Sequence, residues 1–294
     1  MPESVASGIY DLGYRPYDGP RLGTWSVLLT LYRESLRGAF GVGRPTTAKI
    51  APAALIILAL LPAVVQVAIG LFAREARDVL KASDYYNTVK FILALYCAAV
   101  APDLVGRDQR NHTLCLYFSR AVRRRDYAIT KFAAMTTAML VITLLPQALL
   151  LVGNGLATRD VAGYLRTEWD EIGPIVSTGA LGSAVIAAIG VAVAAQTPRR
   201  TFATFGIVLA FVPTLALSNL LVLEIDTDGT HYGVFFSPFS VIEGLTAWIF
   251  NAAPGEGSPV LRAGFAGGAY VIAAGAMICL ASAALLRRYQ RVPA

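Results

Sequence analysis

The feature that most constrains this chain is a series of six apolar stretches, each suited to cross a lipid bilayer as a helix. A bilayer core about 30 Å thick needs about 20 apolar helical residues, because unpaired backbone polar groups are too costly in lipid. The chain has a mean hydropathy of +0.58 and only 15% charged residues, too few for the polar surface of a soluble protein of 294 residues. The sequence therefore predicts an all-α membrane protein with six transmembrane helices. The expected spans are Ile50 to Phe72, Phe91 to Val105, Tyr127 to Val152, Ile175 to Ala195, Phe202 to Leu223 and Phe265 to Leu286.

Two apolar stretches, the second span and residues 233–250, differ from a simple 20-residue membrane helix. The second span is short unless Lys90 reaches out to the membrane surface and the helix continues past Pro102. A further apolar stretch, 233–250, is interrupted by Pro238, Glu243 and Gly244. A seventh full span there would place Glu243 near the middle of the bilayer, at about 2.5 to 3.5 kcal/mol on insertion scales. We expect instead a broken, re-entrant hairpin that enters from the outer face before the last span.

The basic residues predict the orientation. With six spans both termini share one side, and 18 of the 25 Lys and Arg residues fall on that side, whereas 12 of the 19 acidic residues fall on the other. The positive-inside rule places both termini in the cytoplasm of a cell whose plasma or inner membrane holds the chain. This gives a cytoplasmic segment 1–49, a transmembrane domain 50–286 and a cytoplasmic tail 287–294. The arginines lie beside apolar runs, which favours membrane lipids rather than nucleic acid as their partners.

Residues 25–40 have the pattern of an amphipathic helix. Arg33, Glu34 and Arg37 lie outside its apolar sector, as do Val27 and Leu31. Such a helix before the first span is expected to lie flat in the cytoplasmic interface, either as a plain anchor or as a surface that also touches a cytoplasmic partner. The sector, about 120° wide at 100° per residue, consists of Trp25, Leu28, Leu29, Tyr32, Leu36 and Phe40.

The loop 106–126, between the second and third spans, combines an apolar face with arginines. The spacing predicts a short cytoplasmic helix, and three consecutive arginines, 123–125, follow the face. A topogenic signal that binds anionic headgroups would explain the arginines but not the aromatic side chains, which a partner protein would cover better. The residues on the face are Leu114, Tyr117, Phe118, Ala121 and Val122.

No catalytic constellation is evident. The only histidines, His112 and His231, fall on opposite sides of the predicted membrane, and there is no His-Glu-x-x-His motif. The segment 38–45 approaches a phosphate-binding loop but carries Arg44 and Pro45 where such a loop has Lys and Ser or Thr. We therefore expect no enzyme activity, metal site or cofactor in this chain. The spans also show no cluster of carboxylates and lysines of the kind that an ion relay needs.

The arginine-rich loop resembles that of a known family. The pattern Asp108-x-Arg110-x-x-Thr113-Leu114-x-Leu116, followed by Ser119-Arg120-x-x-x-Arg124-x-x-Tyr127-x-x-x-Lys131, is similar to the cytoplasmic loop of ABC-2-type transporter permeases. The amphipathic helix, the six spans and the segment Pro238-Phe239-Ser240-Val241-Ile242-Glu243-Gly244-Leu245 are also similar to that family. Ala121 stands where the family usually has proline.

The resemblance implies the membrane subunit of an ATP-driven exporter. Two copies, expected to be identical, would pair in the membrane, and each would dock a separate cytoplasmic ABC ATPase that holds ATP and Mg²⁺. The segment from Leu114 to Arg125 would be the coupling helix, and the 25–40 helix would lie against the ATPase. The residues nominated for coupling are Leu114, Tyr117, Phe118, Arg120 and Arg124. The residues nominated for the interface helix are Trp25, Leu28, Tyr32, Arg33 and Arg37. Those nominated for the translocation path of the substrate are Tyr96, Phe211, Ser218 and Asn219. Those nominated for the re-entrant hairpin are Pro238 and Glu243.

The exported molecule is expected to be apolar or amphiphilic, and the sequence does not name it. Two other functions fit an apolar six-span chain: a stand-alone channel or secondary carrier, and a membrane scaffold or assembly factor. A neighbouring gene with Gly-x-x-x-x-Gly-Lys-Ser/Thr would favour the exporter, transport that survives ATP depletion would favour the carrier, and a scaffold would show neither transport nor ATPase coupling.

Overall fold

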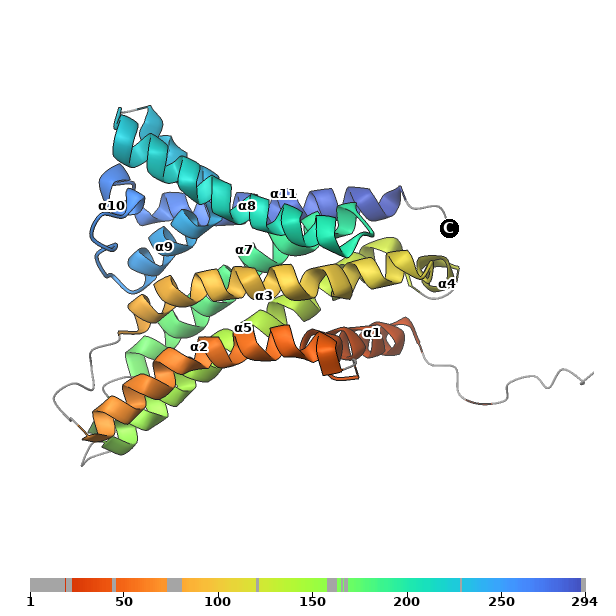
Figure 1. The fold of residues 1–294 in the computed structure, drawn as a ribbon, viewed down its shortest axis with the longest axis horizontal. Helices are drawn as coiled ribbons and strands as arrows, with labels where there is room; N and C mark the ends of the chain where they lie inside the picture. The colour runs from red at the N-terminus through yellow and green to blue at the C-terminus, as the bar shows by residue number, and fades with distance from the viewer. Residues whose placement is uncertain are drawn as a thin grey trace, which may run out of the picture.

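In the computed structural model the chain is helical, with no β-strand among the residues that the structure describes (Figure 1). The described residues are 19, 23–43, 46–72, 81–119, 122–157, 163–164, 166, 169–227 and 229–291. The main elements are α1 (Thr24–Ala39), α2 (Thr46–Phe72), α3 (Ala82–Arg110), α4 (Leu114–Phe118), α5 (Arg124–Ala157), α7 (Trp169–Gln196), α8 (Arg200–Asn219), the π-helix η2 (Leu220–Ile225), the 3-10 helix η3 (Thr230–Phe236), α9 (Pro238–Ile249), α10 (Pro259–Ala263) and α11 (Gly267–Gln290).

Six helices of the described chain are long and apolar enough to cross a membrane, which confirms the predicted number of spans. The second span is longer than predicted, because α3 begins at Ala82 rather than at Phe91 and continues through Pro102. Lys90 lies within this longer helix, and its ammonium group lies 2.8 Å from the Glu243 carboxylate. The spans are Lys49–Gly70, Ala82–Arg110, Arg124–Leu156, Trp169–Gln196, Arg200–Ile225 and Gly267–Gln290.

The centre of the bundle is formed by α3 and α7. Within the most apolar 18 residues of each span, the share that is buried inside the structure is 72% for α3 and 56% for α7. The corresponding share is 22% for the span that contains α2 and for the span that contains α8. Small residues of α7 let its neighbours approach closely, and a Cβ at Gly190 would lie 2.0 Å from Cys97 Sγ of α3. The other spans pack around this pair and leave their outer faces apolar and exposed, as lipid requires.

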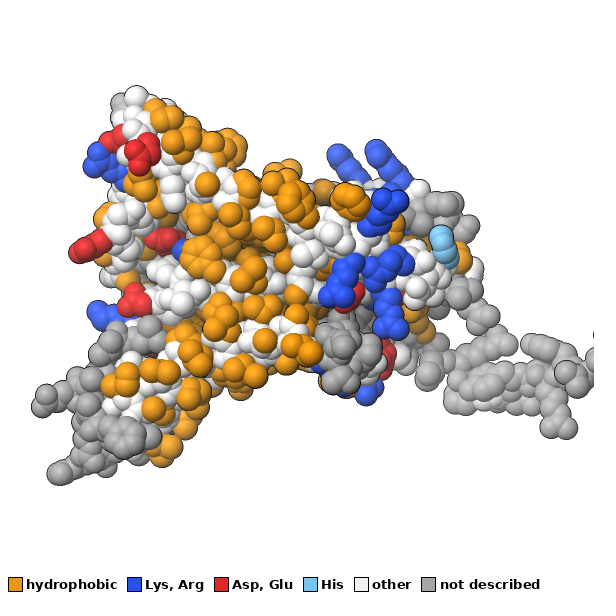
Figure 2. All heavy atoms as spheres, viewed as in Figure 1, with side chains coloured by type: hydrophobic (Ala, Val, Ile, Leu, Met, Phe, Trp, Pro, Cys, Tyr) orange, Lys and Arg blue, Asp and Glu red, His pale blue; other side chains and the backbone are white. Residues whose placement is uncertain are grey.

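The two ends of the bundle differ in shape and charge. One end, which we call the α4 end, holds α4, the end of α11 and the start of α1 (Figure 1). The opposite end, which we call the α9 end, holds α9 and α10 and is splayed, with α8 and α2 diverging. Lys and Arg side chains gather over the α4 end, whereas acidic side chains lie over the α9 end together with a few basic ones (Figure 2).

The apolar stretch 233–250 is broken before Pro238, whereas helix α9 continues through Glu243 and Gly244, which were also expected to interrupt it. The 3-10 helix η3 ends at Phe236, and α9 begins at Pro238 after Ser237, whose hydroxyl oxygen accepts from the Ser240 backbone N–H at 3.3 Å. Proline at the first helical position and serine before it are typical of a helix start. The helix α9 has 12 residues, which is too short to cross a bilayer alone. How deep α9 enters the membrane stays a prediction.

The helix α1 packs along α5, and its buried face is rotated from the predicted sector. Its buried residues are Leu31, Ser35 and Ala39, although Leu31 was placed outside that sector. Trp25, in the middle of the sector, is 76% exposed. The Tyr32 hydroxyl contacts Thr137 Oγ1 of α5 at 2.9 Å, which attaches the helix to the bundle. Amphipathic periodicity alone could not show which flank of the apolar sector meets the protein.

The orientation can be tested by cysteine labelling. In a chain with Cys97→Ala, Cys115→Ser and Cys279→Ala, we expect Glu256→Cys at the α9 end to react with an impermeant maleimide in intact cells. Arg287→Cys at the α4 end should react only after permeabilisation, because the basic end stays inside. Both positions are exposed, so accessibility to the reagent reports sidedness. Labelling of Arg287→Cys in intact cells would show that the orientation is wrong.

Candidate coupling site at the α4 end

The short helix α4 packs its aromatic side chains back onto α5. The rings of Tyr117 and Phe118 each lie 5.8 Å from the ring of Tyr127, centroid to centroid, the second edge-on at 86°. Both side chains are half-buried, while Leu114 is buried. Partial burial, together with the negative charge of Asp108, raises the pKa of the Tyr117 hydroxyl. The aromatic face predicted for this loop is therefore partly covered by the chain itself.

The predicted coupling helix is shorter than expected. It was placed from Leu114 to Arg125, but α4 ends at Phe118 and α5 has already begun at Arg124. Arg120 lies outside the described residues. Cys115 and Ser119 are exposed, so α4 offers a small polar surface beside its half-buried rings. One short helix folded against α5 replaces the longer amphipathic helix that the spacing suggested.

Tyr127 connects α4 to three long helices. It is fully buried, and its hydroxyl donates a hydrogen bond to Asp108 Oδ2 of α3 at 2.6 Å. Lys131 Nζ, one turn along α5, lies 2.9 Å from the same carboxylate oxygen. The ring of Tyr289 of α11 lies 5.1 Å from that of Tyr127. We call Tyr117, Phe118, Tyr127, Asp108, Lys131 and Tyr289 the α4 network.

Arg124 adds a contact between the same elements. Its guanidinium carbon lies 5.7 Å from the Phe118 ring centroid, and its Nη1 donates to the Gln290 carbonyl of α11 at 3.3 Å. Arg123 and Arg125 are exposed, and neither side chain has an ion pair or a hydrogen bond within the described residues. The three consecutive arginines thus divide into one that stacks on α4 and two that remain available to lipid or another protein.

The end of α7 joins the α4 end through its free carbonyls. The Ala195 carbonyl accepts from Gln109 Nε2 of α3 at 3.0 Å and from Arg288 Nε of α11 at 3.1 Å. Carbonyls in the last turn of a helix have no helical partner, so donors from neighbouring helices stabilise them. Arg200 at the start of α8 lies 3.6 Å from the Asp103 carboxylate of α3. These contacts join the ends of α3, α7, α8 and α11 at the α4 end.

Three of the four nominated path residues lie in the interior of the subunit. The Tyr96 hydroxyl donates to the Ala39 carbonyl of α1 at 2.9 Å. Phe211 packs against Phe239 of α9, with ring centroids 5.3 Å apart, and Ser218 Oγ lies 3.3 Å from Ser240 Oγ. Their contact with a substrate stays a prediction. The fourth residue is Asn219, whose Oδ1 is buried and has no partner in the described chain.

At the α9 end the structure brings together two charges that the sequence analysis left apart. Lys90 of α3 and Glu243 of α9 form an ion pair at 2.8 Å, with side chains 6% and 14% exposed. The expectation of no charged cluster within the spans misses this pair. The available signal was that each charge interrupts an apolar stretch and that the two have opposite sign, because an ionised group in such a place needs a partner.

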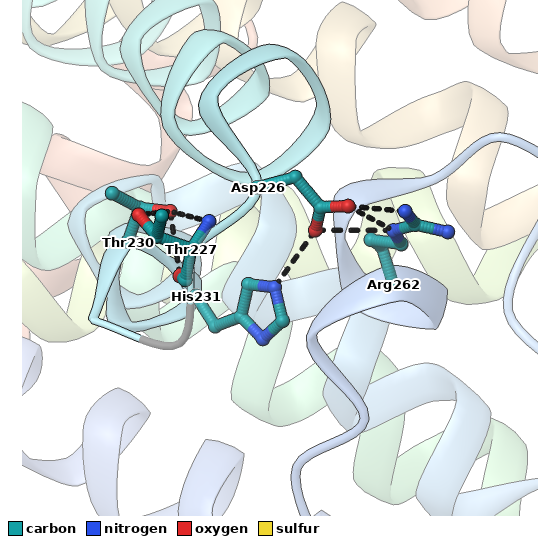
Figure 3. A network of polar contacts seen from close by, with 5 residues as sticks. All are labelled: Asp226, Thr227, Thr230, His231 and Arg262. Atoms are coloured by element: carbon teal, nitrogen blue, oxygen red, sulfur yellow. Dashed lines mark hydrogen bonds and ion pairs between the residues drawn. The ribbon is translucent and has the colours of Figure 1, made fainter.

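A second polar group at the α9 end closes the loop between α8 and α9 (Figure 3). Asp226, in a left-handed conformation with φ of 46°, accepts from Arg262 Nε of α10 at 3.1 Å and contacts His231 Nε2 at 3.0 Å. The hydrogen bond from Arg262, and to a smaller extent that with His231, holds the pKa of the Asp226 carboxyl well below its usual range. Beside it Thr230 Oγ1 donates to the Thr227 carbonyl at 2.8 Å. The carboxylate therefore stays ionised, and the loop stays attached to α10, at neutral pH.

A comparison with protein families agrees with this architecture. The family model described as ABC-2 family transporter protein matches residues 53–292, most of the chain. This chain belongs to the ABC-2 transporter family. The match begins within α2 and ends after α11, so it covers α4 and α9 but not α1. None of the curated proteins matches the sequence. The ABC-2 chain is thus the membrane component of a transporter.

The α4 network predicts a stability effect that a double mutant isolates. Lys131→Met leaves the partly buried Asp108 carboxylate without its cation, and we expect a loss of roughly 3 kcal/mol of stability. The melting temperature of the detergent-solubilised chain should fall. Adding Asp108→Asn should recover part of that loss, because the uncompensated charge is removed. Arg123→Gln, an exposed arginine nearby, is the control and should melt as the wild type does; equal melting of Lys131→Met and wild type would contradict the role of the pair.

Proposed function

We propose that this chain is the permease subunit of an ATP-driven exporter, in which a separate cytoplasmic ABC ATPase docks on α4. The observation that carries the proposal is the α4 network, which ties a short exposed helix to α3, α5 and α11 through Tyr127. Membership of the ABC-2 transporter family supports both a transport role and association with an ABC ATPase.

The mechanism transmits motion through side-chain contacts. ATP and Mg²⁺ would bind the ATPase, and its closure would be the step that has two states. Force on α4 would reach Tyr127 through the rings of Tyr117 and Phe118, and then α3 through Asp108. Because Lys131 neutralises Asp108, the linkage is a hydrogen-bonded ion pair rather than an apolar contact that could slide. The interface helix α1, with Arg33 and Arg37 exposed, would lie beside the ATPase or on lipid.

Two copies of the chain would form the exporter. The helices α2, α8 and α11 carry exposed apolar side chains, which would contact lipid or a second subunit. With the basic α4 end in the cytoplasm, export would proceed from the α4 end toward the α9 end. The cargo would be apolar or amphiphilic, since the described helices present mostly apolar surface.

A secondary carrier is the second candidate, because Lys90 and Glu243 place an ion pair among apolar helices. Ion-coupled carriers use intramembrane charges of this kind. The two functions differ in their energy source: transport by the exporter stops when ATP is depleted, whereas a carrier continues while an ion gradient lasts.

The coupling assignment predicts a loss of ATPase affinity. Tyr117→Ala or Phe118→Ala removes an aromatic anchor, typically a loss of 2 kcal/mol or more, so affinity for the ATPase should fall about 30-fold. The measurement is co-purification in mild detergent of an ATPase that carries the Gly-x-x-x-x-Gly-Lys-Ser/Thr motif, followed by titration. Arg287→Gln, exposed at the same end, is the matched control and should bind normally.

A second variant separates docking from internal packing, since Tyr117 and Phe118 also contact Tyr127. Cys115→Arg places a large cation on the exposed side of α4 and should block docking without lowering the melting temperature. A labelling experiment uses a Cys279→Ser chain, in which Cys115 is the exposed cysteine because Cys97 is buried. Bound ATPase should protect Cys115 from maleimide in this chain. Normal docking by Cys115→Arg, together with unprotected Cys115, would refute the coupling site.

A further inference from the structure

A cleft of about 450 Å³ opens at the α9 end, within a single subunit. Its walls come from the start of α3, the last turns of α5, the start of α7 and the turn that follows α9. These elements meet at the splayed end of the bundle (Figure 1). Clefts of roughly 300 to 1,000 Å³ accommodate small-molecule ligands.

The cleft combines apolar walls with separated charges. Leu150 and Leu151 of α5, with Ile175 of α7 and Phe250, form the apolar part. Lys81 and Glu171 also line it, both are exposed, and neither has an ion pair in the described chain. A cleft whose described lining offers an unpaired cation, an unpaired anion and apolar walls suits a ligand that carries both charges beside an apolar part.

One buried amide in the cleft has an unmet hydrogen-bonding need. Asn154 of α5 is 9% exposed, and its Oδ1 is buried with no partner among the described residues. Gln147, two turns earlier on the same face, donates to the Ala82 carbonyl at 3.3 Å and so has a structural bond. An unsatisfied buried carbonyl oxygen costs about 1 to 3 kcal/mol, and rotation of the Asn154 side chain toward the cleft would let a ligand donor such as an ammonium group offset that cost.

Tyr86 lies between the cleft and Lys90 of the Lys90–Glu243 ion pair. The Tyr86 hydroxyl donates to the Ile175 carbonyl at 2.6 Å, and its ring lies 6.0 Å from that of Phe250. On its other side Tyr86 lines a small internal cavity with Lys90. The cleft therefore lies one side chain away from the buried charge on α3, the helix that ends at the α4 network.

We propose that this cleft binds the headgroup of a zwitterionic amphiphile, with its acidic group toward Lys81 and its ammonium toward Glu171 and Asn154. The proposal rests on the proposed export function and names the class of its cargo. A bilayer aminophospholipid and an exported molecule with the same headgroup chemistry would both fit this cleft.

The test uses the full chain in detergent and three probes: lysophosphatidylethanolamine, the anionic lysophosphatidylglycerol and the cationic dodecyltrimethylammonium. We expect the zwitterionic probe to bind at least fivefold more tightly than either of the others, measured by native mass spectrometry. Glu171→Gln should reduce affinity for the zwitterionic probe about fivefold and leave the anionic probe unaffected. Glu256→Gln, an exposed acidic residue at the same end outside the cleft, is the matched control.

Asn154→Leu separates a ligand contact from a structural role. Because Oδ1 has no partner in the chain, this substitution should lower zwitterionic-probe affinity about tenfold without lowering the melting temperature. A lower melting temperature with unchanged affinity overturns the site. Asn219→Leu is the comparison variant, because Asn219 Oδ1 is also unpartnered among the described residues but lies on α8, outside the cleft. If Asn219→Leu lowers probe affinity and Asn154→Leu does not, the proposed site is wrong.

Two readouts keep this inference distinct from the proposed function. Protection of Cys115 by the ATPase tests coupling and does not depend on the cleft. In the assembled complex, probe-stimulated ATP hydrolysis that Asn154→Leu abolishes supports binding as cargo, whereas binding without stimulation supports a membrane lipid as the occupant. Equal affinity of all three probes overturns the zwitterion assignment even if ATPase docking is intact.

Discussion

A charge that lies among apolar helices must find a partner of opposite sign, because lipid gives it no water. Two such pairs organise this bundle, Lys90 with Glu243 and Lys131 with Asp108. The first holds the short helix α9 against α3, and the second holds α5 against α3 beside α4. Each pair places one member on α3, so the position of this helix depends on both.

At the α4 end a single residue, Tyr127 of α5, contacts three other helices. Tyr127 meets α4 through two rings, α11 through Tyr289 and α3 through its hydroxyl. A tyrosine suits this place because one side chain supplies both a large apolar ring and a hydrogen-bond donor. Phenylalanine would keep the ring contacts but leave Asp108 with only Lys131. The ring and the hydroxyl thus have separate roles, one in packing α4 and the other in orienting the carboxylate.

Apolar length and proline position were enough to predict six spans and the break before α9, because both depend on local chemistry. The sequence could not pair Lys90 with Glu243, which lie 153 residues apart, since only the fold brings α9 beside α3. It placed Leu31 outside the buried face because periodicity does not identify the neighbour that a helix meets. The predicted coupling helix is longer than α4 for a related reason: periodicity does not show that Tyr117 and Phe118 pack on Tyr127 of the next helix.

One helix, α3, carries residues of both ion pairs and of the cleft. The helix α3 has 29 residues, about 43 Å at 1.5 Å per residue. It begins beside Lys81 at the cleft, carries Lys90 within the bundle and reaches Asp108 in the α4 network. Pro102 interrupts its hydrogen bonding between the two ion pairs and gives the helix a place to bend. The Ala98 carbonyl, which Pro102 leaves without its helical donor, accepts from Thr204 Oγ1 of α8 at 3.1 Å, so the two ion pairs and this contact together fix α3 against α5, α8 and α9.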